Sequence, residues 1–394
     1  MKTIKKVLEN GVTVLCSVTN NPELSLTIKS GHINEAKVGL AAVYENIVAL
    51  NANNENLMSI CGGSLTSFVS GVKSSVNVAL KYLYDSCVNT DVTKKVLDFA
   101  VVDITKHTLD MAPLPTRQTK LAYKHTAFSK NQVFWKPERY IEYLKALTVS
   151  DVKNYIADNF VGSNVVVSFS GPEKDFDTVF EAAGKYFGQL PKGKRKSISL
   201  EYTGGFSCIN GNGSKQLAFF GWELPSGYNT AETNVLMSML SGRLERSLAD
   251  AGLAAESVVK IAGYFGLRTL RIAVSCDRKS DLGKCIDIVC KNVKRLKTSL
   301  ASDRRMETSR QRAMTERLCI SNEALPRSVE AAWALLGRNI DYDNDRAITN
   351  IWEISAQDVR YAAREIFNSK ITCVLYSNEP FPKEEDIVKA MSAE

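Results

Sequence analysis

The chain has 394 residues, 44% of them hydrophobic and 24% charged, which is typical of a globular protein with more than one domain. No apolar run approaches the roughly 18 residues of a membrane-spanning helix, which argues against a chain that crosses a bilayer by itself. The net charge of +7 is mild and widely spread, so we predict no nucleic-acid partner.

The chain's ends and cysteines bear on its location. Its first six residues are basic, but no apolar core follows, so we predict no secretory signal. The sequence fits both a short organellar presequence and one already removed. Nine cysteines without C-x-x-C spacing predict reduced, mostly buried thiols, and therefore the cytosol or the mitochondrial matrix.

The first elements alternate between strand and helix patterns. Turn residues, apolar alternation and helical spacing predict strands at 12–18, 24–28 and 64–70, and helices at 37–50, 76–88 and 94–107.

One segment of the first half returns in the second half. Thr148 to Val152 starts a predicted helix with a threonine cap and an acid three residues on, and a buried strand follows at 164–170. About 207 residues later, Ser355 to Val359 starts the same pattern, and a strand follows at 371–377. Self-similarity at this period predicts two copies of one domain.

The remaining patterns place the boundary between these copies. The first copy ends with a helix at 176–187, and the second contains a strand pair across 210–213 with 216–224 as its second member. It continues with helices at 231–240 and 281–296 and a strand that closes near 275. We predict an α+β fold of two homologous domains, 1–191 and 198–394, joined by a basic linker at 192–197. Each is a mixed, mostly antiparallel sheet covered by helices.

Two basic stretches allow two interpretations each. Lys192 to Lys196 is either a solvated linker, which proteases should cut first, or a phosphate contact. The helix that contains Arg304, Arg305, Arg310, Arg312 and Arg317 is either solvated or a docking face for an acidic partner or anionic lipid headgroups.

The segment Gly39 to Val48 has the shape of an inverted zinc motif, H-x-x-E-H, in which two imidazoles one helical turn apart bind zinc. Ala42 and Asn46 occupy the two histidine places, and only Glu45 remains. A methyl group and an amide cannot replace two neutral imidazoles, so we predict neither metal nor catalysis here. Glu45 is either a relic general base or an ordinary helix glutamate, the commoner case.

Histidines elsewhere do not restore the site. His32, His107 and His125 are the only three, and none is spaced to share a ligand set with another.

These motifs together resemble the pitrilysin (insulinase-like, mitochondrial processing peptidase-like) zinc-peptidase family over nearly the whole chain. Gly39 to Ile47 is similar to its "GLAHFLEHM" segment, Gly62 to Ser67 to its "GG-x-x-N-A-x-T-S" strand, and Lys120 to Phe128 to its "LHATAF" segment. The resemblance implies a third zinc ligand, a glutamate, near 101–105. Only Asp103 is acidic there, about one turn out of place.

The resemblance also implies a substrate-binding clamp, which this chain lacks. Its arginine and tyrosine places correspond to Leu248 and Ala255. The glycine-rich loop of the family's substrate-recognising subunit would lie at 237–242, where a single glycine stands.

An inactive member with this pattern is similar to the core subunits of mitochondrial ubiquinol–cytochrome c reductase (complex III). Residues 202–214 and 377–387 are most similar to the second core subunit. The resemblance implies a non-catalytic scaffold, without cofactor, peripheral to the matrix side of the inner membrane. Its partners would be a homologous core or processing-peptidase-like subunit, cytochrome b, cytochrome c1 and the iron–sulfur protein.

Two other functions stay open. One is the inactive partner of a heterodimeric zinc peptidase, mitochondrial or in the bacterial cytoplasm. The other is an active metallopeptidase with unconventional ligands.

Overall fold

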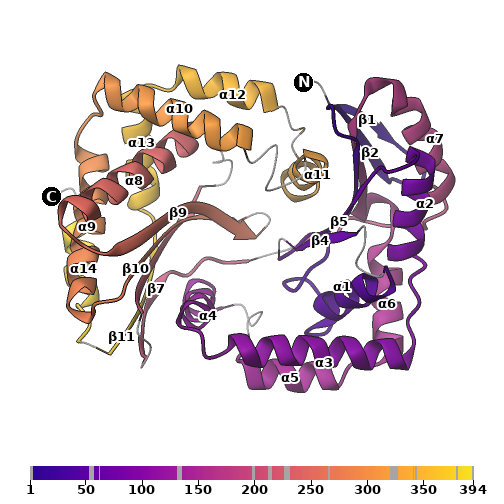
Figure 1. Cartoon of the computed structure of the whole chain (residues 1–394), viewed down its shortest axis with the longest axis horizontal. Coiled ribbons are helices and arrows are strands. Elements are labelled where there is room, and N and C mark those ends of the chain that lie inside the picture. Colours follow the sequence, from indigo (N-terminus) through magenta and orange to yellow (C-terminus); the bar gives the residue numbers. More distant parts are fainter. Residues whose placement is uncertain are drawn as a thin grey trace.

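The computed structural model of the chain describes residues 3–52, 57–61, 63–130, 135–197, 200–211, 215–225, 231–264, 267–319, 327–339, 341, 344–378 and 380–392. Two β-sheets, one from each half of the chain, are each covered by helices (Figure 1). This confirms the predicted α+β class with two mixed sheets.

The first sheet has six strands in the order β1-β2-β6-β3-β5-β4, with β2 and β6 parallel and all other neighbours antiparallel. The edge strands β1 and β4 were missed because their mostly exposed residues give no buried alternation. The strands are β1 (Ile4–Val7), β2 (Thr13–Val18), β3 (Glu23–Ile28), β4 (Met58–Cys61), β5 (Thr66–Gly71) and β6 (Val165–Gly171). The helices are α1 (Leu40–Asn51), α2 (Val76–Cys87), α3 (Lys94–Met111), α4 (Pro115–Ala127), α5 (Pro137–Lys145), α6 (Val149–Asn159) and α7 (Phe176–Phe187).

The second sheet has five strands in the order β7-β11-β8-β10-β9, with β7 and β11 parallel and the others antiparallel. Its strands are β7 (Gly205–Asn210), β8 (Gln216–Leu224), β9 (Ala255–Tyr264), β10 (Leu267–Cys276) and β11 (Ile371–Ser377). Its helices are α8 (Ala231–Asp250), α9 (Leu282–Thr298), α10 (Asp303–Cys319), α11 (Arg327–Arg338), α12 (Asn344–Glu353), α13 (Ala356–Phe367) and α14 (Glu384–Met391).

The two sheets share one topology. The run β2-β6-β3-β5-β4 has the same order and strand directions as β7-β11-β8-β10-β9. The predicted pairing of β7 with β8 is wrong, because β11 lies between them and bonds to both. The boundaries at 191 and 198 stay predictions.

Both predicted helix caps are present and lead into equivalent strands. At the start of α6, Thr148 Oγ1 accepts from the Asp151 amide (3.2 Å), and Asp151 Oδ2 accepts from the Thr148 amide (3.0 Å). Ser355 and Asp358 make the same two bonds at the start of α13. Such reciprocal caps satisfy amides that a helix start leaves free. The helices therefore begin where the repeat predicted, before β6 and β11.

One helix from each half covers the sheet of the other half. In Figure 1, α4 lies beside β7 and α11 beside the first sheet. The α4 side chain Tyr123 packs on Phe219 of β8, with ring centroids 4.9 Å apart. From α11, Trp333 Nε1 donates to Ser67 Oγ (2.8 Å), and Ser328 Oγ donates to Glu23 Oε1 (2.7 Å). These exchanged helices join the halves by buried contacts.

The connector at 192–197 is bonded to the rest of the protein at Gly193, Arg195 and Lys196, whereas Lys192 and Lys194 are exposed, as expected of a solvated linker. Ser163 Oγ donates to the Gly193 carbonyl (2.5 Å), and the Lys196 amide donates to Asn164 Oδ1 (3.2 Å). Half-buried Arg195 donates to the Leu335 carbonyl of α11 (3.3 Å). The segment is therefore a poorer protease target than its composition predicts.

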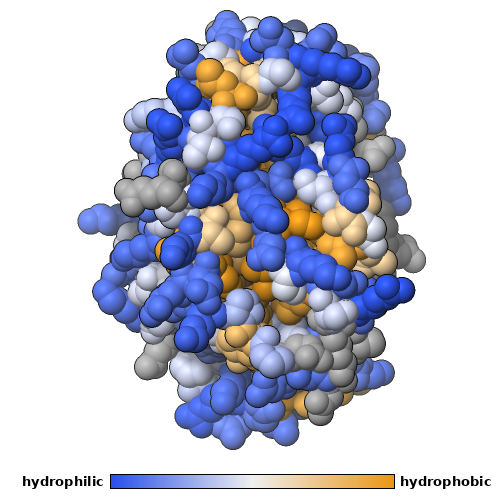
Figure 2. All heavy atoms as spheres, turned by 90° about the vertical axis from the view of Figure 1, so that its left-hand side faces the viewer, coloured by the Kyte–Doolittle hydropathy of each residue, from blue (hydrophilic) through white to orange (hydrophobic). Residues whose placement is uncertain are grey.

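The outer side of the second half, where α9 and α14 lie, is mostly hydrophilic. Figure 2 shows polar and charged side chains over most of this side, with smaller apolar areas between them. Across the ranges that the structure describes, no helix combines the length and apolarity needed to cross a membrane.

Candidate functional site: a zinc-peptidase motif without its ligands

The motif segment begins helix α1 through a local turn that the sequence explains. Gly39 precedes the helix with φ of 91°, a left-handed conformation that favours glycine. The Glu35 carboxylate accepts from the amides of Gly39 (2.7 Å) and Ala41 (2.8 Å). It therefore satisfies the helix start that no cap side chain serves. We did not predict Glu35, although an acid just before a helix was the available signal.

The two histidine places hold side chains that cannot form a zinc site. Ala42 presents only a methyl group, and Asn46 Nδ2 donates to Asp103 Oδ2 on α3 (2.8 Å). Asp103, the only acid near the predicted third ligand, is therefore bonded to the side chain at the second histidine place. The Asn46 amide nitrogen and Asp103 are thus paired where a metal would need two nitrogen ligands, while the buried Asn46 Oδ1 has no hydrogen-bond partner among the described residues.

The retained Glu45 lies in a low-polarity environment against the sheet. Its Oε1 accepts from Thr66 Oγ1 (3.3 Å) at the start of β5. Burial raises the pKa of Glu45 to about 7, against the opposing effect of hydrogen bonds from Cys61 and Thr66. Burial also raises the pKa of Glu35 to about 7, and the charge of Glu45 adds to that rise. Two carboxyl groups at the degenerate motif are thus partly protonated near neutral pH.

The remaining donors do not fit zinc. Within the described ranges, no three His, Cys, Asp or Glu side chains lie close enough together to hold a metal ion. An amide and separated carboxylates do not reproduce the nitrogen-rich ligand sets of catalytic zinc. That the protein binds no metal stays a prediction.

The positions of the substrate clamp are equally unsuited to binding a peptide. Leu248 is 2% exposed and belongs to the core of the second half. Ala255 begins β9 and packs against that core. The expected glycine-rich segment, 237–242, is helical within α8 and forms no loop. Neither clamp position has a side chain that could hydrogen-bond a substrate.

Fold and site together define a class: a two-sheet α+β chain that keeps the frame of an inverted zinc motif and lacks its ligands. Residues 146–312 match the family model described as the peptidase M16 inactive domain. This match covers less than half of the chain and agrees with the resemblance to pitrilysin-type peptidases. Together with the missing ligands, the match favours the predicted degenerate homologue without catalytic activity.

Solved structures share the fold over nearly the full length. A chain of complex III2 from Candida albicans, with Inz-5 bound, has a TM-score of 0.84 at 14% identity, covering 99% of this chain and 100% of that one. The first half of the periplasmic protease PqqL from Escherichia coli has a TM-score of 0.75 at 11% identity, covering 99% and 96%. A protease from Helicobacter pylori has a TM-score of 0.77 at 16% identity, covering 95% and 99%. No curated protein sequence matches the chain.

Restoring both histidines is expected to create weak zinc binding without peptidase activity. In an Ala42→His/Asn46→His variant, Asp103 would accept from the Nδ1 of His at 46, because Asn Nδ2 already occupies that place. Asp103 would then orient an imidazole instead of supplying the third ligand. Adding Asp103→Asn should lower zinc affinity by about 10–100-fold, measured by calorimetry.

The matched control for this prediction is a histidine pair on α2, Val78→His/Tyr82→His. The two positions have the same spacing, but Asp103 takes no part in that pair. Chelator-sensitive peptide hydrolysis by the restored variant would contradict the prediction. So would zinc affinity that is indifferent to Asp103.

Proposed function

We propose that this chain is a non-catalytic structural subunit, with complex III as its leading setting. The observation that carries the proposal is the Asn46–Asp103 pair, which fills the position of a zinc ligand while the surrounding fold is retained. The structural likeness to a chain of complex III2, with its TM-score of 0.84, supports this setting over a protease. The corresponding scores for the two bacterial proteases are 0.75 and 0.77.

The proposed assembly is a heterodimer with a homologous subunit, docked at the matrix side of the inner mitochondrial membrane. Cytochrome b, cytochrome c1 and the iron–sulfur protein would complete its surroundings. A permanent scaffold contact should bury more than roughly 2,000 Å². The role as second core subunit is part of the same proposal.

Helix α3 offers a surface that suits a partner subunit. Phe99, Val102 and Leu109 are 58%, 65% and 55% exposed. Their spacing places them on one side of the helix. Apolar side chains gathered on one exposed face are typical of protein–protein contacts. We therefore include this face of α3 in the proposed interface.

Native co-purification followed by mass spectrometry tests the proposal. We expect a homologous subunit together with cytochrome b and cytochrome c1. Recovery as a lone monomer at physiological concentration would overturn it. Recovery with a zinc-binding M16 subunit and peptidase activity would instead support the inactive partner of a heterodimeric peptidase.

A pair of variants tests the α3 face. Val102→Glu should weaken assembly, because it places a charge on the proposed contact. Val78→Glu is the matched control, since Val78 is 55% exposed and belongs to another helix, α2. Equal assembly of both variants would remove α3 from the interface.

A further inference from the structure

A basic pocket lies between three helices of the second half, away from the degenerate motif. Helices α8, α9 and α10 line an open pocket of about 680 Å³. Its charged lining consists of one carboxylate, Asp250, and six arginines: Arg243, Arg246, Arg295, Arg304, Arg305 and Arg312. The basic stretch noted in the sequence of α10 therefore supplies only part of the pocket, and α8 and α9 supply the rest.

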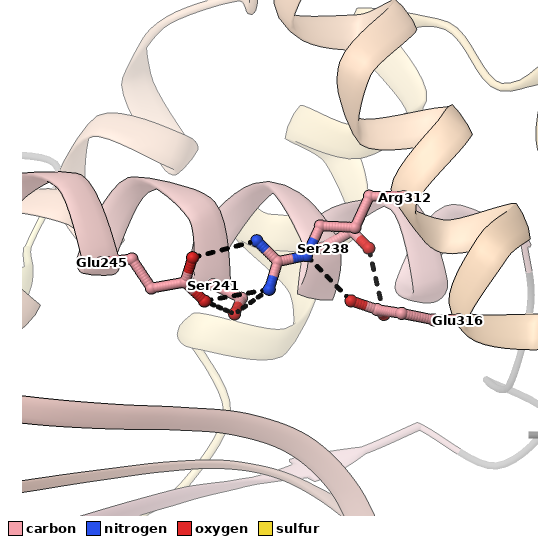
Figure 3. Close-up of polar contacts among 5 residues, drawn as sticks. All are labelled: Ser238, Ser241, Glu245, Arg312 and Glu316. Carbon is pink, nitrogen blue, oxygen red and sulfur yellow. Dashed lines mark hydrogen bonds and ion pairs between the residues drawn. The ribbon is translucent and has the colours of Figure 1, made fainter. Parts of the chain in front are cut away.

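Internal ion pairs neutralise only one of these arginines. Arg312 donates to Glu245 Oε1 (2.9 Å), Glu316 Oε1 (2.9 Å) and Ser241 Oγ (3.2 Å), as Figure 3 shows. Ser238 also donates to Glu316, at 3.2 Å, so both glutamates are already engaged. In the described part of the chain, the other five arginines form no ion pair.

Arg243 is the least satisfied of the five. Its Nε and Nη1 atoms are buried and have no hydrogen-bond partner in the described structure. An unpaired buried donor costs more free energy on a charged group than on a neutral one. Burial, with the charges of Arg305 and Arg295, lowers the pKa of Arg243 to about 10. The positive charges of Arg243, Arg295 and Arg305 therefore lie near one another, beside Arg243 N–H groups that have no hydrogen-bond partner in the described structure.

We propose that this pocket binds the phosphate group of a phosphate monoester, with Arg243, Arg295 and Arg305 as its principal contacts. Planar guanidinium groups match phosphate oxygens with paired hydrogen bonds, and a dianion offsets the repulsion among the three. The inference is independent of the scaffold function.

The rest of the pocket indicates what the phosphate is attached to. A volume of about 680 Å³ exceeds the needs of a single phosphate and lies within the range of small-molecule sites. Hydroxyl groups of Ser247, Ser302, Thr308 and Ser309 share the lining. These groups suit a hydroxylated body such as glycerol or a sugar better than an acyl chain. A free phosphate ester and the headgroup of phosphatidic acid both present this chemistry.

Binding of two matched probes to the purified full-length chain tests the site and distinguishes the two sources. The probes are glycerol 3-phosphate, followed by calorimetry, and phosphatidylcholine vesicles with and without phosphatidic acid, followed by sedimentation. Binding of glycerol 3-phosphate indicates a free phosphate ester as ligand. Binding only to vesicles that contain phosphatidic acid indicates the lipid headgroup. Either result supports the site if it depends on the pocket arginines.

Four variants measure that dependence. Arg243→Gln and Arg305→Gln should each weaken binding by about tenfold or more, because each removes a charged hydrogen-bonding partner. Arg243→Lys keeps the charge but loses the planar fork, so an intermediate loss is expected. Exposed Arg278 lies outside the pocket, and Arg278→Gln should bind like the wild type.

A stability measurement guards against misfolded variants. Without ligand, Arg243→Gln should melt no lower than the wild type, since it removes an uncompensated buried charge. Binding of neither probe would overturn the proposal. The proposal would also be overturned if Arg243→Gln and Arg305→Gln bound the probes as well as the wild type. The same holds if Arg278→Gln weakened binding as much as they do.

Discussion

Replacing Glu45 by glutamine is expected to raise the free energy of unfolding by about 3 kcal/mol at pH 8 and by less than about 1 kcal/mol at pH 5. Glutamine has nearly the same shape and stays neutral, and it can still accept from Thr66, which lies 3.3 Å from the carboxylate. The substitution therefore removes only the cost of a charge at this position.

The sign follows from the direction of the pKa shift. The pKa of Glu45 is raised to about 7 in the folded protein, above its ordinary value of 4.5. Between these values the folded state holds a proton that the unfolded state has lost, so the wild type loses stability as the pH rises. The loss is complete above about pH 7 and absent well below pH 4.5. Denaturant titrations from pH 5 to 8 would follow it.

Two further substitutions make this prediction specific. Glu35→Gln should act in the same direction with a smaller gain, because Glu35 also accepts two backbone amides that glutamine serves less well. Glu181→Gln, at an exposed position on α7, is the control and should leave the pH dependence unchanged. A Glu45→Gln variant whose stability depends on pH as that of the wild type does would contradict this prediction.

Local signals predicted the regular elements well where they were strong. The bounds predicted for the helix at 176–187 and the strand at 371–377 are those of α7 and β11. Both have apolar residues at the spacing of a buried face, and a reciprocal cap marks the helix before β11. Local sequence fixes such features because the interactions involved are local.

Pairings between distant segments could not be predicted in the same way. Asn210 and Gly211 suggested a hairpin between neighbouring strands, yet β11, more than a hundred residues later, separates β7 from β8. The sequence of α4 likewise gives an apolar face without stating which sheet it covers. Such choices depend on the packing of the whole molecule.

The loss of the zinc ligands could be predicted from the sequence, but the contacts that replace them could not. Ala42 and Asn46 are visible in the sequence as lost ligands. The bond from Asn46 to Asp103 depends on how α3 packs against α1, which residue spacing does not specify. The convergence of Arg243, Arg295 and Arg305 from three helices was hidden for the same reason.

Tyr123→Ala is expected to lower the free energy of unfolding by about 3–5 kcal/mol, the usual loss for a buried aromatic side chain. Tyr123 is 1% exposed and belongs to α4, in the first half of the chain. Its ring lies 4.9 Å from that of Phe219, and the Arg271 guanidinium lies 4.7 Å from its centre. Both partners come from the second sheet, so the cavity would open between the halves.

The backbone at Gly221 provides an independent test of the same contact. A methyl group added at Gly221 would lie 2.0 Å from Tyr123 Oη and 2.7 Å from its ring. Gly221→Ala should therefore cost about 1–3 kcal/mol in the wild type by overpacking. In a Tyr123→Ala background the same change should cost little, which a double-mutant cycle would show as coupling. Tyr361→Ala, 62% exposed on α13, is the control for aromatic loss.

Differential scanning calorimetry of the Tyr123→Ala variant should also show that its thermal unfolding is less cooperative than that of the wild type. In the wild type, α4 on the second sheet and α11 on the first connect the two cores, so we expect them to unfold together. Loss of Tyr123 weakens one of these two connections, and the transition should broaden or divide into two. A sharp single transition with a small loss of stability would show that α11 alone couples the halves. A subunit whose proposed role is to hold partners in fixed positions requires this rigidity, because a hinge between the halves would move every surface that they present.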